Sequence, residues 1–217
     1  YLGESGLGRF FYEGETDGES WMKQQFPWHG AYCGDIDIIG WRKPISYYRE
    51  MLYYPKRNKL FLAVREPDGY FGKVKETMWS VWPTWECWTW EGHEGKDVDV
   101  EIYSRYPKVR LYLNGKLIGE RPTTRAEEFK ATFKVPYQAG TLKAVGVDDQ
   151  GNEVENRTLT TAGKVAGIRL TTDGNKLTAN EDDVCFVTVE LVDKNGIRVQ
   201  NAEQELHFEV KGNATLV

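Results

Sequence analysis

The sequence contains few cysteines and histidines, and it lacks long hydrophobic runs. Its 217 residues include three cysteines and three histidines, which are widely separated. An odd number of cysteines without a Cys-x-x-Cys pair argues against a disulfide scaffold and against a zinc site. No apolar run approaches the roughly 18–20 residues that a membrane-spanning helix requires. We therefore expect no metal, no cofactor and no membrane partner.

An excess of positive charge is also missing. The formal net charge is −5, and lysines and arginines are mixed with aspartates and glutamates along the chain. Without a basic patch, nucleic acid and anionic membrane surfaces are poor partners. The chain is long enough to bury a hydrophobic core without disulfide or metal staples, as one large domain or two ordinary ones.

One helix is predicted near residues 44–54, in the stretch KPISYYREMLYYP. Pro44 suits the first helical turn, where its missing N–H costs nothing, and Pro55 ends the helix. The apolar positions that share one face at helical spacing are Ile45, Tyr48, Met51 and Leu52. This face requires a covering partner, and we expect a larger domain to supply it.

Strand patterns dominate the remainder of the chain. Alternating or continuous apolar runs fall at 60–64, 97–103, 129–135 and 141–147. Asn114-Gly115 between two alternating runs is a strong signal for a tight hairpin, because both residues accept positive φ. Short strands separated by turn residues predict a β-sandwich.

The strand pattern restarts near residue 163, with strands expected at 165–173 and 184–193. The run 205–210 alternates, which predicts a strand with Leu206, Phe208 and Val210 pointing inward. About 53 residues are too few for an immunoglobulin-like sandwich, which takes about 100. A second, incomplete sandwich is therefore expected.

Five of the eight tryptophans lie between residues 79 and 90. Such a cluster either anchors a sandwich core or forms a flat aromatic surface on which sugar rings stack. The spacing matches neither a helical stripe nor a single strand face, so the rings must point in different directions. We favour the core or an interface between domains.

Two stretches resemble glycoside hydrolase family 2, particularly bacterial β-galactosidases of the Bacteroides type. The stretch beginning WTWEGHEG at Trp88 and running to LNGK resembles the sandwich that follows the catalytic barrel, and CGDIDIIGWRKPISYYR resembles the approach to the last barrel helix. The resemblance implies a mainly β fold. It comprises the tail of a (β/α)8 barrel (loop plus last helix), an immunoglobulin-like β-sandwich and a second, incomplete immunoglobulin-like β-sandwich. The corresponding limits are residues 1–55, 56–162 and 163–217.

The resemblance further implies a parent enzyme that cleaves terminal β-galactosides with retention, by means of two glutamates. No glutamate here lies in the family's two catalytic motifs, so no catalytic residue is assigned and this chain alone is expected to be inactive. The missing amino-terminal catalytic barrel would be its partner. Tyr1, Glu4 and Trp28 are the candidates for contact with substrate, because barrel loops build the active site. Trp28 could equally fill the core of its own loop.

Asp35 and Asp37 could form an acid pair on one face of a strand. Aspartates near turns more often accept local backbone N–H groups, and we favour that structural role.

The alternative to the enzyme is a non-catalytic carbohydrate-binding or adhesive β-sandwich protein. This alternative leaves the first 54 residues without a role. Galactoside is not distinguished from glucuronide or mannoside by these residues. The cellular location stays open, and only the resemblance favours the periplasm or cell surface of a bacterium.

Overall fold

The computed structural model describes residues 11–12, 34–37, 40–70, 74–75, 83–178 and 183–216. Backbone contacts divide the chain into two compact units, Tyr1–Thr161 and Ala162–Val217. Each unit has its own sheet structure, and each is described separately below.

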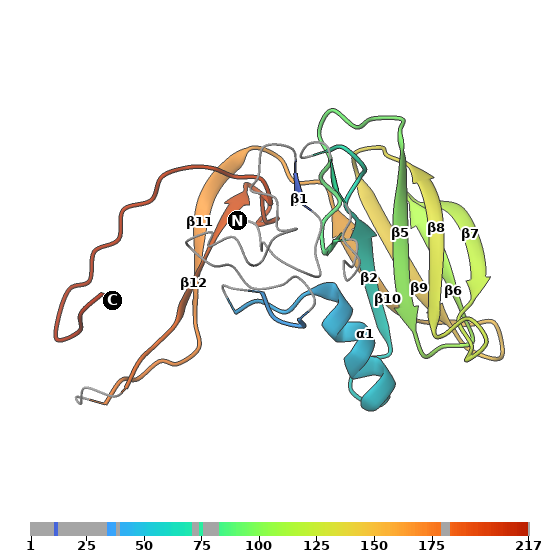
Figure 1. Cartoon of the computed structure of the whole chain (residues 1–217), viewed down its shortest axis with the longest axis horizontal. Coiled ribbons are helices and arrows are strands. Elements are labelled where there is room, and N and C mark those ends of the chain that lie inside the picture. The colour runs from blue at the N-terminus through green and yellow to red at the C-terminus, as the bar shows by residue number, and fades with distance from the viewer. Residues whose placement is uncertain are drawn as a thin grey trace. The chain divides into compact units, whose positions relative to one another are not determined.

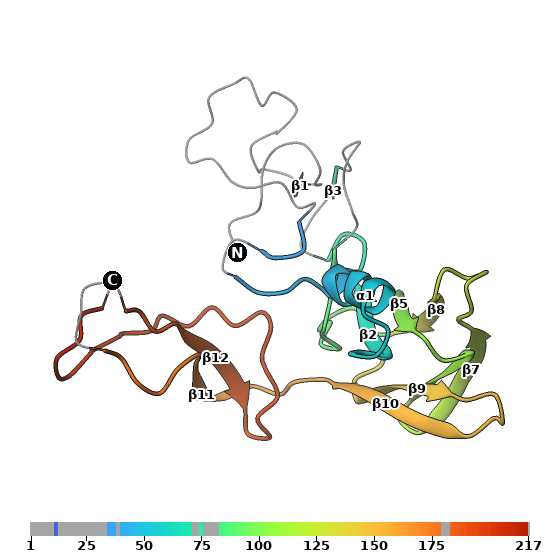
Figure 2. The same ribbon diagram turned by 90° about the horizontal axis from the view of Figure 1, so that it is seen from below.

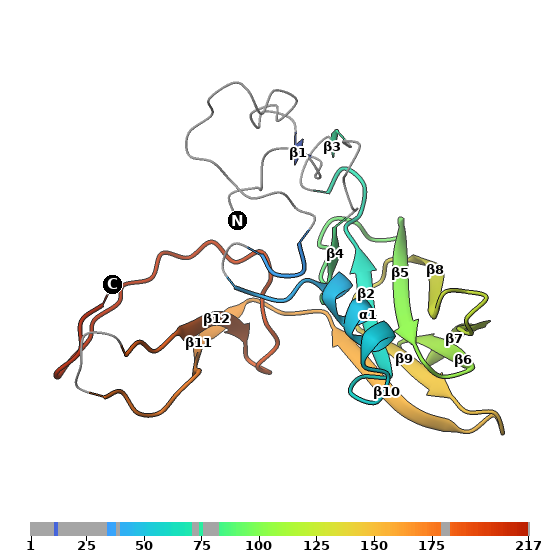
Figure 3. The same cartoon turned by 60° about the horizontal axis from the view of Figure 1, so that its bottom comes forward.

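The first unit contains a four-stranded antiparallel sheet with the strand order β4-β2-β5-β8 (Figure 1; β4 is labelled in Figure 3). Its strands are β2 (Leu60–Arg65), β4 (Thr84–Trp85), β5 (Asp97–Ser104) and β8 (Lys130–Pro136). Inward and outward positions alternate along β5 and β8, as the sequence period predicts for a sheet with one covered face.

A second four-stranded antiparallel sheet, with the order β10-β9-β6-β7, forms the other layer (Figure 2). Its strands are β6 (Lys108–Leu113), β7 (Lys116–Pro122), β9 (Thr141–Val147) and β10 (Glu153–Thr160). A short additional ladder pairs β1 (Phe11–Tyr12) with β3 (Val74–Lys75). The strands expected at 60–64, 97–103, 129–135 and 141–147 are thus confirmed to within one or two residues.

One hydrophobic core lies between the two large sheets. Both sheets contribute to it, through alternate residues of β2, β5 and β8 on one side and of β6 and β9 on the other. Its members include Leu62, Val100, Leu111, Phe133 and Leu142. The arrangement is a β-sandwich, in which the apolar face of each sheet is removed from water by the other.

The predicted hairpin joins β6 to β7. Asn114 and Gly115 take positive φ angles of 50° and 80°, as a two-residue turn of this kind requires. The side chain of Asn114 also fixes the chain between β8 and β9: its Oδ1 accepts from the Thr141 N–H at 2.8 Å, and its Nδ2 donates to the Ala139 carbonyl at 3.1 Å. The turn therefore reverses the chain between β6 and β7, and the Asn114 side chain holds the segment that joins β8 to β9.

Helix α1 (Pro44–Tyr53) begins at the predicted proline and lies beside β2 (Figure 3). Only part of the apolar face predicted for α1 is buried. Met51 is fully buried, but Leu52 is 39% exposed. The sandwich itself covers the buried face, which removes part of the need for another domain. No helix in the described part of the chain is long and apolar enough to cross a bilayer.

The second unit contains one two-stranded antiparallel sheet among its described residues. It pairs β11 (Val165–Thr172) with β12 (Val187–Asp193). Beyond β12, the chain turns at Gly196 and makes a single bridge between Val192 and Arg198. The strands expected at 165–173 and 184–193 are therefore present, the second beginning later than its sequence period indicates.

The strand expected at 205–210 is absent from the described structure. This segment has no assigned strand, and Phe208 and Val210 are 54% and 44% exposed instead of pointing inward. Alternation specifies which side chains share a face, but burial also requires an opposing layer. The described residues of the second unit supply no strand that pairs with 205–210, so its apolar stripe lies open.

The turn after β12 is organised by the buried carboxylate of Asp193. Its oxygens accept from the backbone N–H groups of Gly163 at 2.8 Å, Asn195 at 2.8 Å and Ile197 at 2.9 Å. These donors, first among them Gly163, hold the pKa of the Asp193 carboxyl below its usual value. The charged carboxylate therefore connects the start of β11 to the end of β12.

Acid is expected to weaken the second unit through Asp193. Since the pKa is lower in the folded state, the unfolded state binds the proton first. The stabilisation is therefore present above the unfolded value of about 4 and is lost as pH falls through the folded pKa. Amide resonances of β11 and β12, followed during acid titration, should show this loss, and Asp193→Asn should remove that step. An unchanged acid transition in the variant would contradict the assignment.

Candidate functional site

The three residues predicted to contact substrate, Tyr1, Glu4 and Trp28, lie outside the described residues. Their role stays a prediction. The chemistry that the described residues offer is found in three other places: the loop before α1, the tryptophan cluster and a pocket on the outer face of the first sheet.

The loop before α1 uses its two aspartates structurally. Asp37 Oδ1 accepts from the Trp41 N–H at 2.8 Å, and the Asp37 N–H donates to the Trp41 carbonyl at 2.9 Å. Asp35 forms an ion pair with Arg49 of α1, while its carbonyl accepts from the Lys43 N–H at 2.8 Å. The Asp37 carboxylate thus accepts a local backbone N–H, as predicted, whereas the Asp35 carboxylate pairs with a side chain and joins the loop to the helix.

The tryptophan cluster contributes to the sandwich core. Trp88 and Trp90 are buried core members, and Trp85 packs against the same core while its Nε1 donates to Glu66 at 3.0 Å. Tyr70 lies edge-on to Trp90, with ring centroids 5.1 Å apart. For these three tryptophans the preference for the core is confirmed, whereas Trp79 and Trp82 lie outside the described residues.

His93 follows this cluster and is nearly buried beside Tyr70. Burial is the main cause that lowers the pKa of its imidazole. The neutral ring is therefore the favoured form, which suits packing against aromatic rings. His93 lies in the turn after Trp90, and its backbone N–H donates to the Trp90 carbonyl at 3.0 Å. We therefore interpret it as a structural histidine.

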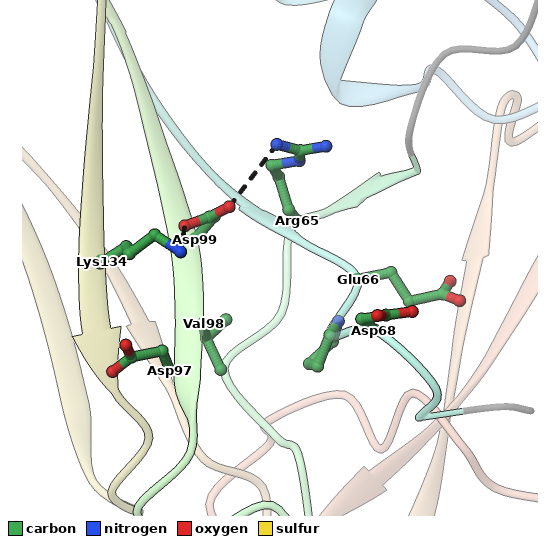
Figure 4. Close-up of a pocket in the computed structure, with 8 residues that line it drawn as sticks. Arg65, Glu66, Asp68, Asp97, Val98, Asp99 and Lys134 are labelled. Atoms are coloured by element: carbon green, nitrogen blue, oxygen red, sulfur yellow. Dashed lines mark ion pairs between the residues drawn. The ribbon is translucent and has the colours of Figure 1, made fainter. Parts of the chain in front are cut away.

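A pocket of about 210 Å³ lies on the outer face of the first sheet, at the end of β2 (Figure 4). Its lining consists of Arg65, Glu66, Pro67, Asp68, Asp97, Val98, Asp99 and Lys134. Asp99 lies between two cations, with Arg65 at 3.5 Å and Lys134 at 3.9 Å. Opposite charges on neighbouring strands thus neutralise one another across this face of the sheet.

Two of the four carboxylates that line the pocket have partners in the structure. A retaining glycosidase requires one carboxylate free to attack and a second that holds a proton. In the pocket, Asp99 is engaged by two cations and Glu66 accepts from Trp85. The described residues also contain no group of three or more histidine, cysteine, aspartate or glutamate side chains that could hold a metal ion.

Sequence reasoning did not identify this pocket, although it recognised the alternation of Asp97, Asp99 and Glu101 along one face. A signal was present in the lysines that alternate in the same way along β8. Lys130 approaches Glu101 at 3.7 Å, and Lys134 approaches Asp99. In the pairing of β5 with β8, Asp99 lies directly opposite Lys134, while Lys130 lies opposite Tyr103 and reaches Glu101 diagonally.

The fold and its core define a β-sandwich unit with an attached helix, and comparison with known protein families identifies its class. Residues 168–217 match the family described as glycoside hydrolase family 2 C-terminal domain 5. Residues 95–155 match a domain of unknown function, DUF4982. The resemblance to glycoside hydrolase family 2 inferred from the sequence is confirmed, and the chain is related to a carboxy-terminal part of these proteins.

Individual relatives cover most of this chain. A β-galactosidase of Bacteroides ovatus, BoGH2A, is 29% identical over 87% of this chain and 21% of its own length. A β-glucuronidase of Formosa agariphila is 31% identical over 70% of this chain and 16% of its own length. The crystal structure of a family 2 member from Bacteroides cellulosilyticus is 36% identical over 85% of this chain and 24% of that one, with a TM-score of 0.75. The chain thus spans about a fifth of the length of the curated relatives.

Proposed function

We propose that this chain is the carboxy-terminal part of a retaining family 2 glycosidase that cleaves terminal β-galactosides. The observation that carries the proposal is the similarity to the β-galactosidase BoGH2A over 87% of this chain. The match of residues 168–217 to a family 2 carboxy-terminal domain supports the same placement. In this proposal, residues 1–55 end the catalytic barrel, 56–162 form an immunoglobulin-like sandwich and 163–217 form part of another.

The proposed contribution of this chain is to close and rigidify the catalytic domain, without the catalytic glutamates. The described carboxylates favour this view. Asp35 pairs with Arg49, Asp37 accepts from the Trp41 N–H and Asp99 pairs with Arg65. Each of these contacts joins two parts of the first unit, which is the use expected of carboxylates in a structural part of the enzyme. Tyr1, Glu4 and Trp28 stay the proposed substrate contacts at the rim of the active site.

A β-glucuronide is the second candidate substrate, because the Formosa relative at 31% identity is a β-glucuronidase. The two sugars differ in the configuration at C4 and in the group at C6, which is a hydroxymethyl in the galactoside and a carboxylate in the glucuronide. A site for glucuronide therefore needs a cationic or hydrogen-bonding partner for that group. The residues that would make this choice belong to the catalytic domain in this proposal.

Turnover assays test the proposal directly. The whole gene product and the 217-residue chain should each be given chromogenic β-galactoside and β-glucuronide. We expect the whole gene product to hydrolyse the galactoside at a higher kcat/KM than the glucuronide, and the chain alone to hydrolyse neither. A higher kcat/KM for the glucuronide would show that the substrate is a β-glucuronide and not a β-galactoside. Hydrolysis by the chain alone would overturn the division of roles, and polysaccharide binding without hydrolysis by the whole gene product would favour the adhesive alternative.

A further inference from the structure

The loop between β7 and β8 contains a strained backbone segment. Glu128 and Phe129 are consecutive residues with positive φ angles of 55° and 59°. Among the described residues other than glycine, only Asn114 shares a positive φ. Asparagine adopts this left-handed conformation readily, whereas a bulky side chain such as phenylalanine makes it energetically unfavourable. Strain of this kind persists only where the surrounding structure holds it.

The amino-terminal part of the loop is a compact turn around Thr124. The Thr124 N–H and Oγ1 both donate to the Glu127 carboxylate, at 3.0 and 2.6 Å. The Thr124 carbonyl accepts from the Phe129 N–H at 2.9 Å, and the Glu127 carbonyl accepts from the Lys130 N–H at 3.0 Å. We call residues 124–129 the strap, because these bonds close them into one unit.

Two elements outside the strap hold its left-handed end. At the end of β5, the Ser104 N–H donates to the Phe129 carbonyl at 2.9 Å, and the Arg105 guanidinium carbon lies 4.0 Å from the centre of the Phe129 ring. From α1, the Tyr48 hydroxyl donates to the Glu128 carbonyl at 2.6 Å. This carbonyl belongs to the peptide group between the two left-handed residues. The bond from α1 therefore fixes the orientation of the strained peptide itself.

We propose that the strap and α1 form a conformational latch, in which the Tyr48 hydroxyl holds the strap in its left-handed conformation. When α1 moves away or the hydroxyl is lost, the strap relaxes to backbone angles that L residues adopt more readily. The coupling is reciprocal, so the closed strap also stabilises the helix in its place on the sandwich. The latch lies entirely within the first unit, and it does not depend on the proposed function.

A double-mutant cycle of Tyr48→Phe and Glu128→Gly tests the latch. Tyr48→Phe removes the hydroxyl but keeps the ring, which lies 5.0 Å from that of Tyr103. Glu128 is exposed, so glycine at this position mainly removes the conformational cost of its positive φ. Arg125→Gly is the matched control, because Arg125 is exposed in the same loop and its φ is not positive. Urea unfolding of the 217-residue chain, followed by tryptophan fluorescence, gives the unfolding equilibrium constant of each variant.

We expect Glu128→Gly alone to lower the unfolding equilibrium constant about three- to tenfold, because glycine accepts the left-handed conformation without steric penalty. In the Tyr48→Phe chain the same substitution should give no gain, since the relaxed strap leaves only the entropic cost of glycine. Arg125→Gly should raise the constant in both backgrounds. An equal gain from Glu128→Gly with and without the hydroxyl would overturn the proposal, because the strain would then not depend on α1. Absence of any gain in the otherwise unchanged chain would also overturn it.

Discussion

Replacement of Trp88 by alanine is expected to lower the free energy of unfolding of the first unit by about 3–5 kcal/mol. The Trp88 ring is fully buried in the sandwich core and lies edge-on to Tyr137, with centroids 5.1 Å apart. Its Nε1 donates to the Gln138 carbonyl at 3.0 Å. The substitution therefore leaves a cavity and removes this hydrogen bond. Against a total stability of about 5–15 kcal/mol, this is a large fraction.

Tryptophan fluorescence during urea unfolding measures this effect in the appropriate unit. All eight tryptophans lie within Tyr1–Thr161, so their emission reports on the first unit alone. Leu117→Ala on β7 is the control, because Leu117 is 50% exposed and truncation there should change stability by no more than about 0.5 kcal/mol. Equal losses for the two variants would show that Trp88 does not anchor the core.

Met51→Ala is expected to cost the first unit about 2–5 kcal/mol. Met51 is fully buried between α1 and the first sheet, in a cluster with Phe61, Ala63 and Tyr103. Its truncation opens a cavity that the stacked aromatic rings around it cannot readily fill. The same fluorescence measurement should show an earlier unfolding midpoint.

The adjacent Leu52→Ala is the matched control, because it shortens the neighbouring side chain on the exposed face. Leu52 is 39% exposed, and alanine favours the helix, so the change in the 217-residue chain should stay within about 0.5 kcal/mol. A larger loss of unfolding free energy for Leu52→Ala than for Met51→Ala would mean that Leu52, and not Met51, is the side chain buried against the sheet.

Local sequence signals predicted the strands and the hairpin of the first unit well. Asn114-Gly115 predicts its turn because both residues accept positive φ. The strict alternation in β5 predicts one buried face and one face toward solvent. Pro44 predicts the start of α1 because its fixed φ and missing N–H suit the first helical turn. These features depend on residues that are neighbours in the chain, so a single sequence carries them.

Features that depend on distant partners could not be predicted in the same way. Helical spacing placed Met51 and Leu52 together, but only the position of β2 and β5 decides which of them is buried. Alternation in 205–210 indicated a strand, whereas burial of Phe208 also requires an opposing layer. The pairing of Asp99 with Arg65 and Lys134 similarly depends on three strands from separate parts of the chain.

The predicted substrate contacts illustrate the other limit of sequence reasoning. The family resemblance, together with the general rule that barrel loops line the active site, predicts Tyr1, Glu4 and Trp28 as substrate contacts. Asp35 and Asp37 could be judged by a physical argument, because local backbone donors compete for aspartate oxygens near turns. The structure bears out that argument for Asp37, which accepts from the Trp41 N–H, whereas the Asp35 carboxylate pairs with the side chain of Arg49.

The central claim is that the parent protein is a retaining glycosidase whose reacting carboxylates lie outside this chain. A retaining enzyme forms a covalent glycosyl-enzyme intermediate, so a slow-reacting fluorinated galactoside should label its nucleophile. Peptide mass mapping of the labelled whole gene product would then locate the sugar. We predict a single labelled glutamate outside residues 1–217, and a labelled residue within them would contradict the account.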